Sequence, residues 1–246
     1  MLSDVASLGL SLFAMWMARK PATPQRTYGF YRVEILAALV NAASLIAVSF
    51  YIFVEAYHRL WAPPEVAGLG LMGVASGGLL VNILGLFLLH AGQNESLNIR
   101  GAWLHLIADA LGSAGAIVAG ALVWAFGWTL ADPIASILIA CLVLYSSWGL
   151  LRETVAVLME GAPGHLDVDE VREAISGIQG VQAVHDLHVW SITSGMVALS
   201  VHVAASEATP QRELLSAIRA KLHDRFGIHH STVQIETEGF GDCESC

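Results

Sequence analysis

Long runs without a charged residue constrain this chain more than any other feature. From Leu36 to Val54 there is none, and the whole 246-residue chain is 55% hydrophobic and only 13% charged. A helix needs about 20 mostly apolar residues to cross the hydrocarbon core of a bilayer. The sequence therefore predicts a multi-pass α-helical integral membrane protein in contact with lipid. Five visible spans are expected, at about residues 1–18, 33–57, 66–90, 102–126 and 133–153.

The segment between the first two expected spans indicates the orientation. Residues 19–32 hold four basic residues, two prolines and no acidic residue, which is typical of a cytoplasmic loop under the positive-inside rule. Counting spans from this loop puts the link 92–100 and everything after the fifth span in the cytoplasm. Residues 5–18 are uncharged but too few to cross a bilayer, so the chain is expected to start inside a span.

After the transmembrane domain, 1–160, the pattern becomes that of a soluble domain, 161–240, with a short tail, 241–246. Residues 161–246 carry 5 basic and 12 acidic residues, a net charge of −7, which argues against a nucleic-acid partner. Periodicity predicts a small α+β domain of order α-β-β-α-β. Its expected parts are a helix capped by Asp167, strands Val184–Ile192 and Met196–Ala204, a helix opened by Pro210, and a strand Thr232–Glu236.

Within the fourth expected span, His105 and Asp109 are four residues apart and therefore share one face of a helix. Ionisable groups at membrane depth usually face a protein interior or a water-filled cavity, and an imidazole with a carboxylate forms half of a tetrahedral zinc site. Asp4, on another span, is a third candidate ligand. The alternative is an interhelical hydrogen-bond or ion-pair network. Asn41 and Asn82 are interpreted as interhelical hydrogen-bonding residues, and Glu55 and Asp132, near span ends, as solvated.

The soluble domain is rich in histidine and carboxylate side chains that could bind metal. Strand alternation places His185 with Leu187 and Val189 on one face and His188 on the other, so that His185 and His188 serve one site only across a bulge. The terminal pair Cys243 and Cys246 has the spacing of zinc ligands, and a disordered tail is an equal reading. The chain has no phosphate-binding loop, no His-Glu-x-x-His and no Gly-x-Ser-x-Gly, which argues against ATP-driven pumping and intramembrane hydrolysis.

Several stretches together resemble the cation diffusion facilitator family, most closely its zinc, cobalt and cadmium exporters. The stretches that carry the resemblance are Ser3-Asp4, Arg26 to Glu34, Asn98 to Asp109, Asp132-Pro133 and His185 to Trp190. The resemblance implies six spans, of which the first and the start of the second are not in this chain, followed by a ferredoxin-like cytoplasmic domain in a homodimer.

The resemblance also implies the site residues. His105 and Asp109 match one His-x-x-x-Asp pair of the transport site, and Asp4 matches the aspartate of the other pair, whose histidine would fall before Met1. A regulatory cytoplasmic zinc site is implied at His185, His202, His229 and Glu236, to which Cys243 and Cys246 could add a second.

The function expected from these ligands is zinc efflux in exchange for protons by alternating access. Zinc binds deprotonated ligands, so proton binding on the far side favours zinc release, and histidine titrates near neutral pH. Cadmium or cobalt are expected alternative ions, and no enzymatic activity or resident cofactor is expected besides regulatory zinc. One rival hypothesis is a non-transporting zinc sensor or dimer partner anchored in the membrane, and a more remote one is an intramembrane metalloenzyme.

Overall fold

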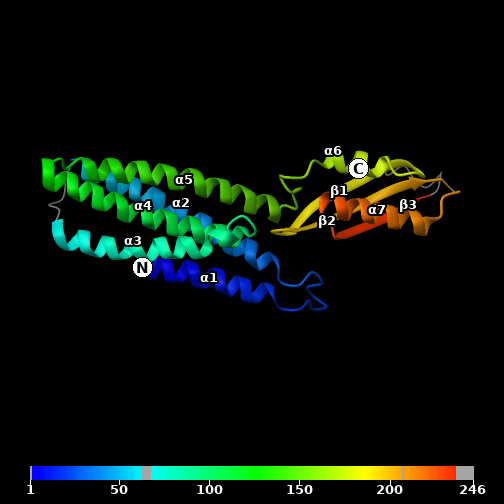
Figure 1. Cartoon of the computed structure of the whole chain (residues 1–246), viewed down its shortest axis with the longest axis horizontal. Helices are drawn as coiled ribbons and strands as arrows, with labels where there is room; N and C mark the ends of the chain where they lie inside the picture. Colours follow the sequence, from blue (N-terminus) through cyan, green and yellow to red (C-terminus); the bar gives the residue numbers. More distant parts are fainter. Residues whose placement is uncertain (1, 62–67, 207, 237–246) are drawn as a thin grey trace. The chain divides into compact units, whose positions relative to one another are not determined.

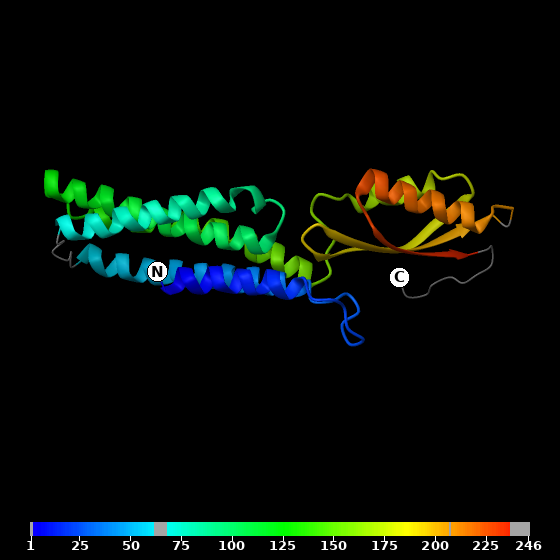
Figure 2. The same ribbon diagram turned by 60° about the horizontal axis from the view of Figure 1, so that its bottom comes forward.

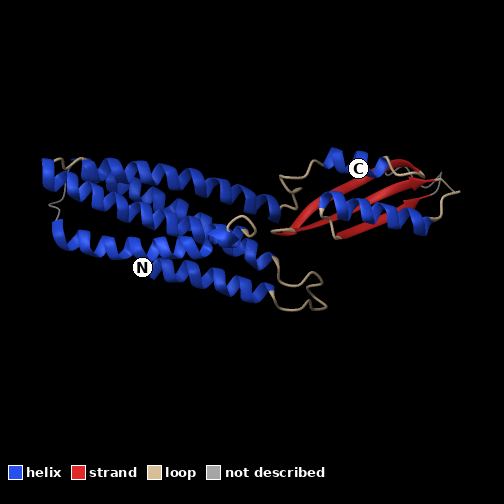
Figure 3. Ribbon diagram, in the orientation of Figure 1, coloured by secondary structure: helices blue, strands red, loops and turns tan. Residues whose placement is uncertain are grey.

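The computed structural model describes residues 2–61, 68–206 and 208–236, and the chain divides into two units, residues 1–155 and 156–246. The first unit consists of helices, whereas the second combines helices with a three-stranded sheet (Figure 3). This confirms the expected fold class of a helical membrane bundle followed by a small α+β domain.

In the part of the chain that the structure describes, five α-helices build the first unit, and the last of them runs a few residues past its end. They are α1 (Leu2–Ala18), α2 (Arg32–Trp61), α3 (Gly68–Leu89), α4 (Leu97–Phe126) and α5 (Ala131–Leu158), with a short 3-10 helix, His90–Gly92, after α3. Four segments within the described residues are long and apolar enough to cross a membrane, Arg32–Trp61, Ala75–Gly92, Leu97–Phe126 and Ala131–Leu158, and Val5–Ala18 is a shorter apolar helix.

Helix α4 begins five residues before its expected start because Ser96 caps it. The Ser96 hydroxyl accepts a hydrogen bond from the Ile99 amide, which satisfies one of the free N–H groups of the first turn. The helix ends at Gly127, whose φ of 67° is favourable for glycine and whose N–H donates to the Val123 carbonyl. Half of the expected polar link 92–100 is therefore helical.

Helix α4 packs against α1, α2 and α3, and the five helices run lengthwise beside one another (Figure 1). Its buried positions include Asn98, Gly101, His105 and Leu106, which recur every three to four residues and form one stripe. Gly101 permits the close approach of two neighbours, because a Cβ there would lie 3.4 Å from both Asn41 Cβ on α2 and Leu150 Cδ2 on α5.

The second unit contains α6 (Val168–Ser176), β1 (Val181–Thr193), β2 (Met196–Ala205), α7 (Gln211–Phe226) and β3 (His230–Glu236). The strand order is β1-β2-β3, with β1 antiparallel and β3 parallel to β2. Both helices cover the same face of the sheet (Figure 2). The core lies between them and the sheet and includes the fully buried Ile175, Leu199, Ile218 and Leu222.

The predicted cap of α6 is confirmed. Asp167 Oδ1 accepts hydrogen bonds from the amides of Asp169 at 2.9 Å and Glu170 at 3.4 Å. The parallel pairing of β2 with β3 requires a crossover, and α7 supplies it with Leu214, Ile218 and Leu222 facing the sheet. The helices occupy one face, so the other face of the sheet is left for polar side chains.

Candidate metal sites

His105 lies on the buried stripe of α4, and the partly exposed Asp109 lies one turn further along the helix beside it. His105 Nε2 and Asp109 Oδ2 are 3.5 Å apart, and the two side chains are 11% and 33% exposed. In a tetrahedral zinc site with bonds of about 2.0–2.1 Å, two ligand atoms stand roughly 3.4 Å apart. The pair therefore already has the spacing of two corners of such a site, inside a helix of membrane-spanning length.

Asp4 belongs to the first turn of α1, but its side chain lies outside the part of the chain that the structure describes. What the structure does place is α1 itself, which packs against α2 and α4. The role of Asp4 as a third ligand stays a prediction.

A buried hydrogen-bond network holds α1 against its neighbours. Ser7 Oγ donates to Asn41 Oδ1 at 3.1 Å, Asn41 Nδ2 donates to Ser11 Oγ at 3.2 Å, and Asn98 Nδ2 donates to the Ser11 carbonyl at 2.9 Å. Asn98 precedes His105 by two helical turns on the same stripe of α4. The network thus joins α1, α2 and α4 next to the candidate site, and it confirms the interpretation of Asn41 as an interhelical hydrogen-bonding residue.

On the open face of the sheet, His185, His202 and Glu236 form a second group, with one ligand atom of each within 4.8 Å of the others. His185 Nε2 lies 3.1 Å from Glu236 Oε2, and His202 Nδ1 lies 3.1 Å from Glu236 Oε1. The residues come from three neighbouring strands, because His185 pairs with His202 in the ladder and Glu236 ends β3 beside Ala204. Two imidazoles and a carboxylate suit zinc or a similar divalent metal.

A β-bulge in β1 makes this group possible and corrects the predicted alternation. The ladder shifts register between His185 and His188, and Asp186 has a φ of +49°, a conformation in which aspartate is more common than most residues. Leu187 and Val189 therefore face the core. His185 was predicted to share their face, but the structure places it on the opposite face.

The bulge also brings two residues beside this group that the sequence had kept apart from it. Asp186 Oδ2 lies 3.4 Å from His202 Nε2, and Asp186 Oδ1 lies 2.7 Å from His188 Nε2. Asp186 was not predicted, because strict alternation places it on the face opposite His185, although a bulge was the stated condition for His185 and His188 to serve one site.

Of the other predicted ligands, the structure describes His229 alone, and it does not bring this residue into the group. His229 is exposed, and its ring lies against that of His223 with centroids 4.6 Å apart. Cys243 and Cys246 lie outside the described residues. The structure thus assembles three of the four expected cytoplasmic ligands within one chain.

Glu55 and Asp132, near the helix ends, were expected to be solvated, but the structure places both in ion pairs. Arg59 Nε contacts Glu55 Oε1 at 3.0 Å and Arg59 Nη1 contacts Asp132 Oδ2 at 3.1 Å, which joins α2 to α5.

Two family models match the chain. The cation efflux transmembrane domain matches residues 1–159, and the cytoplasmic domain of cation efflux proteins matches residues 163–238. Each match coincides with one of the two kinds of fold described above.

Several relatives match almost the whole chain. A cadmium, cobalt and zinc/H(+)-K(+) antiporter of Bacillus subtilis is 45% identical over 97% of this chain and 78% of its own length. The metal cation efflux system protein CzcD of Cupriavidus metallidurans is 42% identical over 96% of this chain and 75% of its own. The zinc transporter ZitB of Escherichia coli is 42% identical over 96% and 76%.

Among solved structures, the metal-bound C-terminal domain of the CzcD transporter from Cupriavidus metallidurans is 42% identical to the part it matches. It covers 29% of this chain and 99% of that domain, with a TM-score of 0.28.

Proposed function

Because the chain belongs to the cation efflux family, whose members are transporters and not enzymes, we propose that it exports zinc across a membrane in exchange for protons. The observation that carries this proposal is the pair His105 and Asp109. Their ligand atoms are 3.5 Å apart on a membrane-length helix, and His105 is buried there. Asp4 is proposed as the third ligand of the same transport site.

The choice of zinc follows from the ligands and from the relatives. Imidazole and carboxylate together suit zinc, and they also accept cobalt and cadmium, the ions in the name of the Bacillus subtilis relative. We propose zinc as the principal ion, with cadmium and cobalt as alternatives.

The proposed mechanism uses the competition between metal and protons for one set of ligands. Zinc binds when the imidazole is neutral and the carboxylate is ionised, so loading from the cytoplasm releases any protons that these groups hold. Once the bundle opens to the far side, protons bind to the same groups and zinc leaves. Alternating access requires only that the two ends of the bundle open in turn around this site.

The cytoplasmic domain is proposed to bind regulatory zinc and to join two chains as a homodimer. The group His185, His202 and Glu236 supports the metal site, and the matched family domain supports the dimer. His229, Cys243 and Cys246 remain proposed additional ligands, which a partner chain or the end of the chain would have to bring to the site.

The experiment that tests the proposal is proton-gradient-driven uptake of zinc-65 into proteoliposomes. The unsubstituted chain is expected to accumulate zinc only when the pH gradient is present, and His105→Ala and Asp109→Asn are expected to abolish accumulation. His58→Ala is the matched control, because His58 is an exposed histidine of the same unit. Undiminished uptake by His105→Ala would contradict the assignment.

The same group on the sheet favours a second candidate, a zinc sensor that does not transport. In that case zinc would bind to the cytoplasmic domain with no flux across the membrane. Zinc binding that is lost in His202→Ala, together with uptake indistinguishable from empty vesicles, would favour the sensor over the transporter.

A further inference from the structure

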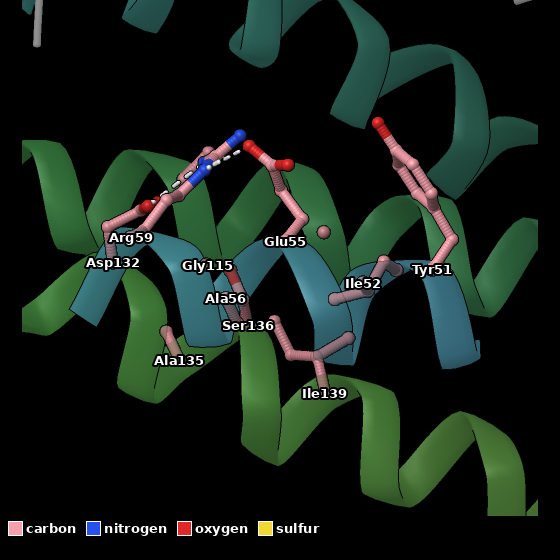
Figure 4. Close-up of a pocket in the computed structure, with 12 residues that line it drawn as sticks. Tyr51, Ile52, Glu55, Ala56, Arg59, Gly115, Asp132, Ala135, Ser136 and Ile139 are labelled. Carbon is pink, nitrogen blue, oxygen red and sulfur yellow. Dashed lines mark hydrogen bonds and ion pairs between the residues drawn. The ribbon is translucent and has the colours of Figure 1, made fainter. Parts of the chain in front are cut away.

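A cavity of about 280 Å³ lies in the membrane unit between α2, α4 and α5. Its wall on α4 is formed by Gly112, Gly115 and Ala116, which follow Asp109 along the helix. Figure 4 shows Gly115 with the lining residues of α2 and α5. Because α5 leads into the cytoplasmic domain at its C-terminal end, its N-terminal end at Asp132 lies on the opposite side of the membrane. The cavity therefore lies between the candidate transport site and the side to which an exporter releases its ion.

Three charged residues close one side of this cavity, and we call Glu55, Arg59 and Asp132 the release-side cluster. The guanidinium of Arg59 contacts Glu55 on its own helix at 3.0 Å and Asp132 on α5 at 3.1 Å. All three side chains are partly buried, between 24% and 42% exposed. One cation thus bridges two carboxylates, and the contact to Asp132 holds the ends of α2 and α5 together.

The remaining wall of the cavity is made largely of small residues. A Cβ at Gly112 would meet no atom within 4 Å, so no side chain fills the space beside it. At Gly115 a Cβ would lie 2.6 Å from Ile139 Cδ1, so the side chain of Ile139 on α5 reaches the backbone of α4 there. The space has room for several waters, each of which takes about 30 Å³ in the liquid, and therefore for a hydrated divalent ion.

We propose that the release-side cluster is the outer gate of the transporter, which Arg59 closes by bridging Glu55 and Asp132. A divalent cation in the cavity competes with the guanidinium for the same carboxylates and repels it, so arrival of the ion weakens the bridge between α2 and α5. The two carboxylates then hold the ion on its way out. This proposal rests on the proposed function, because only export gives the cavity a release side.

The gate is tested by the accessibility of the cavity. Ser136 lines the cavity on α5, and Ser136→Cys is placed in the full chain with Cys141, Cys243 and Cys246 changed to serine. A charged, membrane-impermeant methanethiosulfonate is added to intact cells, whose outer membrane surface corresponds to the release side. Arg59→Gln, which removes both partly exposed ion pairs, is expected to raise the labelling rate roughly five- to tenfold, and Asp132→Asn, which removes one, roughly two- to threefold.

The matched control is the ion pair at the other end of the bundle. Arg100 Nη1 contacts Glu153 Oε2 at 2.5 Å and joins α4 to α5 near the cytoplasm. Arg100→Gln is expected to leave the labelling rate of Ser136→Cys unchanged. Unchanged labelling in both Arg59→Gln and Asp132→Asn, or an equal rise in Arg100→Gln, would overturn the proposal.

Zinc flux measured on the same variants separates the two proposals. If labelling rises as expected but the parent chain carries no zinc, export is refuted while the cluster stands as the closure of the cavity. If the parent carries zinc and labelling does not respond to Arg59→Gln or Asp132→Asn, the gate is refuted and export stands.

Discussion

The hydrogen-bond network around Asn41 leads to a prediction whose size follows from the structure. Asn41 is 3% exposed and makes two interhelical hydrogen bonds, to Ser7 and Ser11 of α1. Interhelical hydrogen bonds within membranes contribute about 0.6 kcal/mol each on average, so Asn41→Leu is expected to remove about 1 kcal/mol. The penalty stays small because each freed serine hydroxyl can bond to a carbonyl of its own helix.

The loss should appear both in stability and in transport. For a unit of this size, about 1 kcal/mol corresponds to a fall of roughly 2–4 °C in the unfolding temperature. The unfolding temperature is measured by tryptophan fluorescence while the protein is heated in detergent micelles. Because the network holds α1, which carries Asp4, beside His105, loosening it is also expected to raise the KM for zinc by up to about fivefold, the equivalent of about 1 kcal/mol.

Asn82→Leu is the matched control. Asn82 is also buried, on α3, but its side chain makes no hydrogen bond among the residues that the structure describes, contrary to its interpretation as an interhelical hydrogen-bonding residue. Asn82→Leu is expected to leave both quantities unchanged or to raise the unfolding temperature. The reasoning is refuted if Asn41→Leu unfolds at the parent temperature with the parent KM, or if Asn82→Leu loses as much.

Three further predictions concern the cytoplasmic group and the packing of α4. Glu236→Gln is expected to weaken zinc binding by the full chain at least about tenfold in titration calorimetry, because it removes the charge that both imidazoles contact. His229→Ala is expected to leave that affinity unchanged, since its ring lies against His223; an equal loss would mean that His229 joins the site. Gly101→Val is expected to destabilise the bundle by about 1–3 kcal/mol in thermal unfolding, because its Cβ would already lie 3.4 Å from two neighbours. At Gly9, where a Cβ meets nothing within 4 Å, the same substitution should cost less.

The parts of the fold that follow from local patterns were predictable. Uncharged runs identified the membrane helices, and the capping residue Asp167 marked the start of α6. These features depend on composition and on residues close together in the sequence. The start of α4 was missed because Ser96 was not recognised as a cap before a mostly polar first turn.

The parts that depend on tertiary context were not predictable. Alternation failed at Asp186, because one residue of positive φ shifts every later side chain of β1 to the opposite face. The partners of Asn41 lie on α1, and one of the two partners of Arg59, Asp132, lies on α5, so the packing of α1 and α5 decides these contacts. From the sequence, Asn41 was expected to have interhelical partners that could not be named, whereas Glu55 and Asp132, the partners of Arg59, were expected to be solvated.

Helix α4 explains how structure and function are combined in so small a bundle. One stripe carries Asn98, which bonds to α1, then Gly101, which admits α2 and α5, and then His105. The spacing of three to four residues places all three on one face, so the contacts that fix the positions of the neighbouring helices lie within two turns of the histidine. A substitution along this part of the stripe should therefore alter the proposed metal site through geometry as well as through stability. For this reason Gly101→Val is expected to raise the KM for zinc. A substitution on the lipid-facing side of α1 that lowers the unfolding temperature by the same amount should leave the KM unchanged.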